Sequence, residues 1–185
     1  MKRILWVLLP VVVVAAGCAS LAQKRYTKEL LGAQRAIGAG QVGEAYSRLQ
    51  AANKAAAAGH LDATPIQLLV AELRLVQGNS AEARDIAETV LAQNQRNPQA
   101  NELVAKVLLK QGAFDEAEQH LVTAQLEYGT LGERQRVEDL LNLTRGLRAY
   151  SQGDTLAARK YWATIENTQL RDAVEGSTSG QSARG

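Results

Sequence analysis

The only cysteine of the chain, Cys18, is the residue whose position most clearly indicates chemistry. A basic start at residues 1–3 and an uncharged apolar run over residues 4–16 precede it. A basic region, an apolar stretch and a small residue at the cleavage site are the parts of a secretory signal, and Gly17 places the cut directly before Cys18. A lone thiol cannot form an internal disulfide bond, but it can carry a lipid. The sequence therefore predicts that residues 1–17 are a signal peptide.

The stretch Val14-Ala15-Ala16-Gly17-Cys18 resembles the lipobox of bacterial lipoproteins. In that family the cysteine thiol is joined to a diacylglyceryl group, and cleavage frees its amine, often for further acylation. Ala15 departs from the family's usual leucine three residues before the cysteine. Ala19 stands where an inner-membrane retention signal would have aspartate. The resemblance therefore implies a lipid anchor on Cys18 and, in a Gram-negative host, a position in the outer membrane facing the periplasm.

Two alternatives to a lipid anchor stay open for this segment. The first is a membrane-spanning helix, but thirteen apolar residues are too few to span a bilayer, which needs about 20. Extension to Ala22 crosses Gly17, Cys18 and Ser20, so a membrane-spanning anchor fits poorly. The second is an ordinary signal peptide with a coincidental cysteine. If the chain is lipidated, two or three acyl chains would hold it stably, whereas one binds only marginally.

The rest of the sequence shows no pattern that predicts catalysis. His60 and His120 lie far apart without the spacing of metal ligands, and both are expected to face solvent. Glu116 and Glu118 are expected to face water on a charged helix surface. Phosphate-binding loops and the GxSxG and HExxH motifs do not occur. We therefore expect no enzyme activity, no metal and no cofactor.

Composition points to a helical protein that does not bind nucleic acid. Without residues 1–17 the chain has nineteen basic and nineteen acidic residues, so there is no positive excess to neutralise phosphates. The remaining 168 residues suit one compact domain. Alanine, the strongest helix former, is abundant, whereas the chain has only one Phe and three Pro. An all-α fold without strands is predicted.

Four glycines, spaced 38, 34 and 41 residues apart, mark a repeated pattern: Gly40, Gly78, Gly112 and Gly153. Seven residues before them stand the small residues Ala33, Ala71, Ala105 and Gly146. Five residues after them stand Ala45, Ala83, Ala117 and Ala158. Apolar residues follow nine and twelve positions after each glycine: Leu49, Ala87, Leu121 and Trp162, then Ala52, Val90, Ala124 and Ile165. The pattern predicts four units, each of two helices that are joined at the glycine and cross closely at the small residues.

The central unit, Lys110-Gln111-Gly112-Ala113-Phe114-Asp115-Glu116-Ala117, resembles the tetratricopeptide repeat, as does the 34-residue period that precedes it. Arg74 stands where the repeat prefers an aromatic residue, and the prolines are displaced to Pro65 and Pro98. The resemblance implies an α-solenoid of about four antiparallel helix pairs. A generic helical bundle with accidental spacing is the alternative.

These boundaries give a domain organisation for the chain. Residues 18–23 are predicted to be a lipidated linker, and residues 24–170 to be the helical repeat domain. Residues 171–185 are polar and glycine-rich near their end, so they are predicted to be a disordered tail.

In the repeat family, the first helix of each pair lines the concave face. The resemblance implies a partner-binding surface there, made by Leu30, Gln34, Leu68, Glu72, Glu102, Lys106, Leu109, Leu143, Leu147 and Tyr150, with Thr27, Ile37, Pro65, Leu75, Gln99 and Leu140 beside them. This surface is mostly apolar and lacks a Lys, Arg and Asn cluster that would clamp a terminal carboxylate. It is predicted to receive an apolar helix or extended segment. The alternative is that its leucines form the core of a small array.

The sequence thus predicts a lipid-anchored scaffold of the bacterial cell envelope. It would bind another envelope protein or peptide segment, and outer-membrane protein, pilus or secretin assembly are candidate pathways. Self-association through the first or last unit is a further candidate contact. The alternative from a different class is an envelope enzyme or small-ligand carrier with an unrecognised site.

Overall fold

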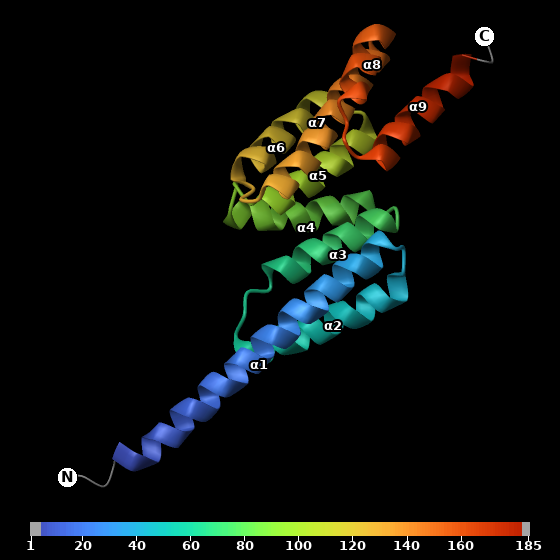
Figure 1. Cartoon of the computed structure of the whole chain (residues 1–185). Coiled ribbons are helices and arrows are strands. Elements are labelled where there is room, and N and C mark those ends of the chain that lie inside the picture. Colours follow the sequence, from blue (N-terminus) through green and yellow to red (C-terminus); the bar gives the residue numbers. More distant parts are fainter. Residues whose placement is uncertain (1–4, 183–185) are drawn as a thin grey trace. The chain divides into compact units, whose positions relative to one another are not determined.

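The computed structural model describes residues 5–182, with side chains placed over residues 21–174. The predicted basic start at residues 1–3 lies outside this range. Within it the chain is helical and has no strand. The helices are α1 (Leu5–Gly38), α2 (Val42–Gly59), α3 (Thr64–Val76), α4 (Ser80–Gln93), α5 (Pro98–Gln111), α6 (Phe114–Glu127), α7 (Leu131–Ser151), α8 (Thr155–Ala163) and α9 (Thr168–Ser182) (Figure 1).

The chain divides into two compact units, the first ending at Ile86 and the second beginning at Ala87. Helix α4 therefore belongs to both. The first unit contains α1, α2 and α3, and the second contains α5 to α9. The prediction of helix pairs can be checked within each unit, whereas their stacking into one continuous solenoid stays a prediction.

The four predicted turn glycines lie between consecutive helices. Their φ angles are positive: +69° at Gly40, +86° at Gly78, +75° at Gly112 and +85° at Gly153. This left-handed backbone ends a helix without steric cost only where there is no Cβ. At Gly112 the turn is held by backbone bonds from the N–H of Gly112 to Leu109 O and from the N–H of Ala113 to Leu108 O. The predicted turn at each of the four glycines is confirmed.

The small residues predicted at the helix crossings are all buried. The alanines at the two crossing positions have an exposed fraction of 0%: Ala33, Ala45, Ala71, Ala83, Ala105, Ala117 and Ala158. The fourth unit has Gly146 in place of the first alanine, and it is buried as well. Short side chains at these points let the two helix backbones approach closely.

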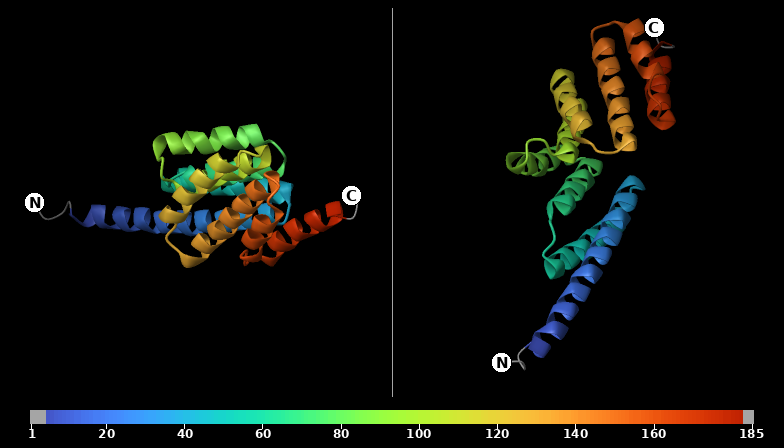
Figure 2. Two further views of the ribbon diagram at one scale, coloured as in Figure 1. Left: turned by 90° about the horizontal axis from the view of Figure 1, so that it is seen from above. Right: turned by 60° about the vertical axis from the view of Figure 1, so that its left-hand side comes forward.

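In the first unit, α1 and α2 lie side by side and α3 packs against both (Figure 2). Their core contains Tyr26, Leu49, Ile66 and Leu73 among buried alanines. The hydroxyl of Tyr26 donates a hydrogen bond to the carbonyl oxygen of Asp62, which ties α1 to the link between α2 and α3.

In the second unit, each helix from α5 to α8 packs against the next. Ion pairs join α6 to α7, because Glu118 accepts hydrogen bonds from both Arg145 and Arg148 at 2.7 Å. The expectation that Glu118 simply faces water was therefore wrong. Two arginines reach it from the neighbouring helix, and only 20% of its side chain is exposed. Glu116, by contrast, is exposed as expected.

The C-terminal segment differs from the sequence expectation of a tail from residue 171. The structure has helical backbone in α9 up to Ser182, and residues 183–185 lie outside the described range. Leu170 and Val174, one helical turn apart, pack against a cluster that contains Trp162 and Ile165. The glycine- and serine-rich composition suggested disorder, but these two apolar residues provide a packing face. The last pair thus has a covering helix that the sequence did not reveal.

Candidate functional site

Cys18, the predicted site of lipid attachment, lies in α1, whose helical backbone runs without interruption from Leu5 to Gly38. The predicted linker at residues 18–23 is therefore helical in the structure. Within the described part of the chain, no helix is both long and apolar enough to cross a membrane.

The predicted partner-binding surface of the first unit is partly core. Leu68 is only 4% exposed, and Leu30 is half-buried against the α1–α2–α3 core. Glu72 is half-buried, and Gln34 is exposed. Of the flanking residues, Ile37 and Leu75 are buried, Pro65 is half-buried and Thr27 is exposed. Of this set, only the polar residues Gln34 and Thr27 are fully accessible to a partner.

The α7 residues of the predicted partner-binding surface are also partly buried in the core. Leu143, Leu147 and Tyr150 are half-buried and pack against the cluster around Trp162. The ring centroids of Tyr150 and Trp162 are 5.9 Å apart, with the rings tilted by 43°. Leu140, beside them in sequence, is half-buried. These side chains hold α8 and α9 on α7 and keep part of their surface open to solvent.

On α5 the predicted surface contains a buried ion cluster. Glu102 is 4% exposed. Its Oε1 lies 2.7 Å from Nζ of Lys106, and its Oε2 lies 2.8 Å from Nη2 of Arg136. The hydroxyl of Tyr128 donates to the same Oε2 at 2.7 Å, and the Arg136 guanidinium lies 5.5 Å from the centre of the Tyr128 ring. We call Glu102, Lys106, Tyr128 and Arg136 the Glu102 cluster.

The electrostatics of the Glu102 cluster keep its carboxylate ionised. Burial alone would raise the pKa of Glu102, but the charges of Lys106 and Arg136, with hydrogen bonds from Lys106 and Tyr128, outweigh it and lower the pKa below its ordinary value. Burial, followed by the adjacent Glu102 carboxylate, raises the pKa of Tyr128. Burial opposes the charge of Arg136, yet the same carboxylate raises the pKa of its guanidinium. The cluster therefore holds one fixed negative charge and two positive charges.

This arrangement favours binding over proton transfer. A carboxylate with a lowered pKa stays charged at neutral pH and is a poor general acid or base. The side chains of Lys106 and Arg136 are 29% and 47% exposed, so both cations can be reached from solvent. Leu109, one turn further along α5, is half-buried. Gln99, at the start of α5, is exposed.

The histidines lie in different settings. His60 is exposed at the end of α2, as expected. The expectation for His120 was wrong, because it is half-buried and its Nδ1 lies 2.8 Å from the side-chain oxygen of Asn101. Buried Asn101 also donates to the carbonyl oxygens of Gln95 and Asn97. Among the described residues, no three His, Cys, Asp or Glu gather as they would to hold a metal.

A tetratricopeptide repeat family model matches residues 77–136. The matched segment runs from the turn before α4 into α7, and all four residues of the Glu102 cluster lie within it. It includes the turn glycines Gly78 and Gly112, whose 34-residue spacing led to the same family from the sequence. The match supports a tetratricopeptide repeat protein. Neither curated proteins nor solved structures gave a match.

Proposed function

We propose that this protein is a lipid-anchored scaffold that binds another protein, or a peptide segment, at the bacterial cell envelope. The observation that carries the proposal is the repeat segment at residues 77–136, because tetratricopeptide repeats commonly bind other proteins and are typically not catalysts. Within it α5 offers a half-buried leucine, Leu109, one helical turn from the partly exposed cation Lys106. An apolar segment of a partner fits such a surface.

The proposed location rests on the N-terminal residues. Cys18 follows Gly17 at the end of an apolar run, and Ala19 lacks the charge of an inner-membrane retention signal. We therefore propose a diacylglyceryl anchor on Cys18 and a position on the periplasmic face of the outer membrane. Outer-membrane protein, pilus and secretin assembly are the proposed pathways.

Site-specific photo-crosslinking in intact cells tests the proposed binding surface. A photoreactive amino acid is placed at Leu109 on α5 and, as a matched control, at exposed Gln119 on α6 of the same helix pair. The proposal expects one discrete crosslinked protein from position 109 and none from position 119. Equal crosslinking from both positions, or none from either, would contradict it.

The anchor is tested separately by the intact mass of the mature protein. Lipidation predicts a chain that begins at Cys18 and carries the added mass of a diacylglyceryl group. The Cys18→Ala variant should lose this mass and leave the membrane fraction. An unmodified Cys18 in the wild-type chain would overturn the anchor but not the protein-binding surface.

A further inference from the structure

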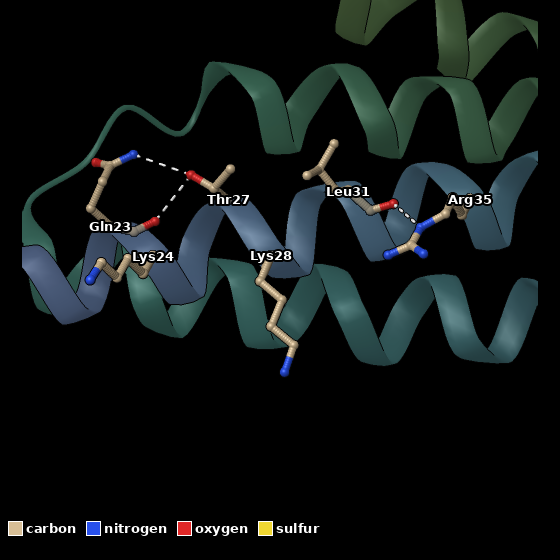
Figure 3. Close-up of a pocket in the computed structure, with 6 residues that line it drawn as sticks. All are labelled: Gln23, Lys24, Thr27, Lys28, Leu31 and Arg35. Atoms are coloured by element: carbon tan, nitrogen blue, oxygen red, sulfur yellow. Dashed lines mark hydrogen bonds between the residues drawn. The ribbon is translucent and has the colours of Figure 1, made fainter.

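The outer face of α1 carries a basic stripe that the other helices of the first unit leave exposed. The stripe consists of Leu21, Lys24, Lys28, Leu31 and Arg35, all of which are exposed. Alternating steps of three and four residues place all five on one side of a helix. Figure 3 shows the shallow hollow that four of them line together with Gln23 and Thr27.

The polar contacts on this face stay within α1. Gln23 donates to the hydroxyl of Thr27, and Nε of Arg35 donates to the carbonyl oxygen of Leu31. Over the residues with placed side chains, neither Lys24 nor Lys28 forms an ion pair. The one acidic residue between positions 21 and 38, Glu29, is held by Arg48 of α2 at 3.0 Å. The charge of the stripe is therefore not neutralised from within this range.

The distribution of charge along the chain sets this helix apart. Residues 21–38 contain four basic residues and one acidic residue, whereas residues 39–185 contain fifteen basic and eighteen acidic residues. Two exposed leucines, Leu21 at 66% and Leu31 at 54%, lie among the cations. Basic residues mixed with apolar ones on one helix face suit an anionic membrane surface, where the cations meet phosphates and the leucines enter the interface.

The position of the stripe next to the proposed anchor favours a membrane over an acidic protein. Cys18 lies on the same helix, and at a rise of about 1.5 Å per residue the stripe begins about 5 Å from it and ends about 25 Å from it along the axis. A lipid on Cys18 would thus hold this face within a few helical turns of the bilayer. Symmetric pairing of two copies through this face is unfavourable, because two basic stripes would repel each other.

We propose that the stripe on α1 docks on anionic phospholipid and lays this helix along the membrane surface. The proposal rests on the proposed anchor at Cys18, and it adds an orientation that anchoring alone does not give. Two acyl chains of a diacylglyceryl group suffice to hold the chain on the bilayer, so the basic face would determine how α1 lies on that surface.

The test uses the full chain, expressed in a bacterium and reconstituted in its processed form. The vesicles consist of phosphatidylcholine alone or of equal parts of phosphatidylcholine and phosphatidylglycerol. An environment-sensitive fluorophore is attached through Leu31→Cys, because a lipidated Cys18 has no free thiol. The same label at Leu126→Cys, a 77% exposed position on α6, is the control site.

The proposal expects the label at position 31 to be shielded from aqueous quenchers on the anionic vesicles only. Molar salt, which shortens the Debye length to about 3 Å, should restore exposure. The label at position 126 should stay exposed on both vesicles. Equal exposure of position 31 on the two vesicles would overturn the proposal and leave an acidic protein as the occupant.

Charge reversal gives the second arm. The variant Lys24→Glu/Lys28→Glu/Arg35→Glu should lose the shielding, with preference for anionic vesicles falling on the order of 100-fold. The control variant Arg134→Glu/Arg159→Glu/Lys160→Glu changes the net charge by the same amount at exposed positions of the second unit. This control should keep the shielding of the label at position 31. Shielding that survives in the first variant would overturn the proposal.

The wild-type chain separates this test from that of the anchor. If Cys18 of the wild-type chain reacts with the label, the anchor proposal has failed. Docking is then measured by flotation of the unlabelled chain with the two kinds of vesicle. Preference for anionic vesicles that the α1 variant loses would support docking without the lipid, and equal flotation would overturn it.

Discussion

Gly146 of α7 and Trp162 of α8 pack so closely that a Cβ at position 146 would lie 2.1 Å from the indole nitrogen of Trp162. Residues 146 and 162 stand seven positions before and nine positions after the turn glycine. The other three units have alanine at the first of these positions and leucine or alanine at the second. The fourth pair exchanges a methyl group for a hydrogen on one helix and gains an indole on the other. Trp162 is 2% exposed, so its ring has little room to move.

Gly146→Ala is therefore expected to destabilise the protein by roughly 1–3 kcal/mol, the usual cost of overpacking a filled core. Urea unfolding followed by circular dichroism measures this change. Gly132→Ala is the control on the same helix, because a Cβ there meets nothing within 4 Å. That control should be neutral or stabilising by about 0.5 kcal/mol.

The pair Gly146→Ala/Trp162→Leu should be less destabilised than the sum of the two single variants. The double variant has alanine and leucine at these two positions, as the third unit has at Ala105 and Leu121. It also removes the indole N–H, a buried group without a hydrogen-bond partner among the described residues. A double-mutant cycle should give a favourable coupling of about 0.5–3 kcal/mol. Additive effects would show that the two positions do not share one packing space.

Gly112→Ala is expected to cost about 1–2 kcal/mol, because φ is +75° at this turn and a Cβ is unfavourable there. Gly112→Asn should cost less, since asparagine tolerates the left-handed region better than alanine does. Thermal unfolding ranks the three proteins. If alanine proved as stable as glycine, the turn between α5 and α6 would not require this backbone conformation.

The Glu102 cluster predicts a dependence of stability on pH. The pKa of Glu102 is lowered on folding, so its contribution is complete above the unfolded pKa of about 4.5 and is lost as the pH falls through the lower folded value. Glu102→Gln should destabilise the protein by roughly 1–3 kcal/mol at pH 7 and by much less at pH 3. The urea unfolding midpoints of the wild type and the variant at pH 7 and at pH 3 measure this difference in stability.

The matched control for that experiment is Glu116→Gln on α6, where the side chain is exposed. It should change stability by no more than about 0.5 kcal/mol at either pH. A pH profile of Glu102→Gln parallel to that of the wild type would contradict the assigned role of Glu102.

Asp139 of α7 fixes the link between α8 and α9. Its two carboxylate oxygens accept hydrogen bonds from the backbone N–H groups of Glu166 at 2.9 Å and Asn167 at 3.1 Å. Asp139→Ala should leave these donors without a partner and increase amide hydrogen exchange over residues 166–174. Asp139→Asn keeps one acceptor and should have a smaller effect. Unchanged exchange in the alanine variant would show that α9 is held by its apolar contacts alone.

The sequence by itself determined the helix pairs. Gly78 and Gly112 mark turns because a left-handed helix end is a local requirement on one residue. Ala105 and Ala117 mark a crossing because two helices joined by a short turn must meet at fixed distances from it. Both signals depend on residues close together in the chain, so they were readable from spacing.

Only the tertiary structure decided which polar side chains meet. Lys106 is one turn from Glu102 on the same helix, but the other partners of Glu102 come from the end of α6 and from α7, and Asp139 caps a link 27 residues away. Leu170 and Val174 became a packing face only once Trp162 was in place beside them. Such contacts depend on which helix turns lie opposite each other and how far long side chains reach, and the spacing within a repeat does not specify either.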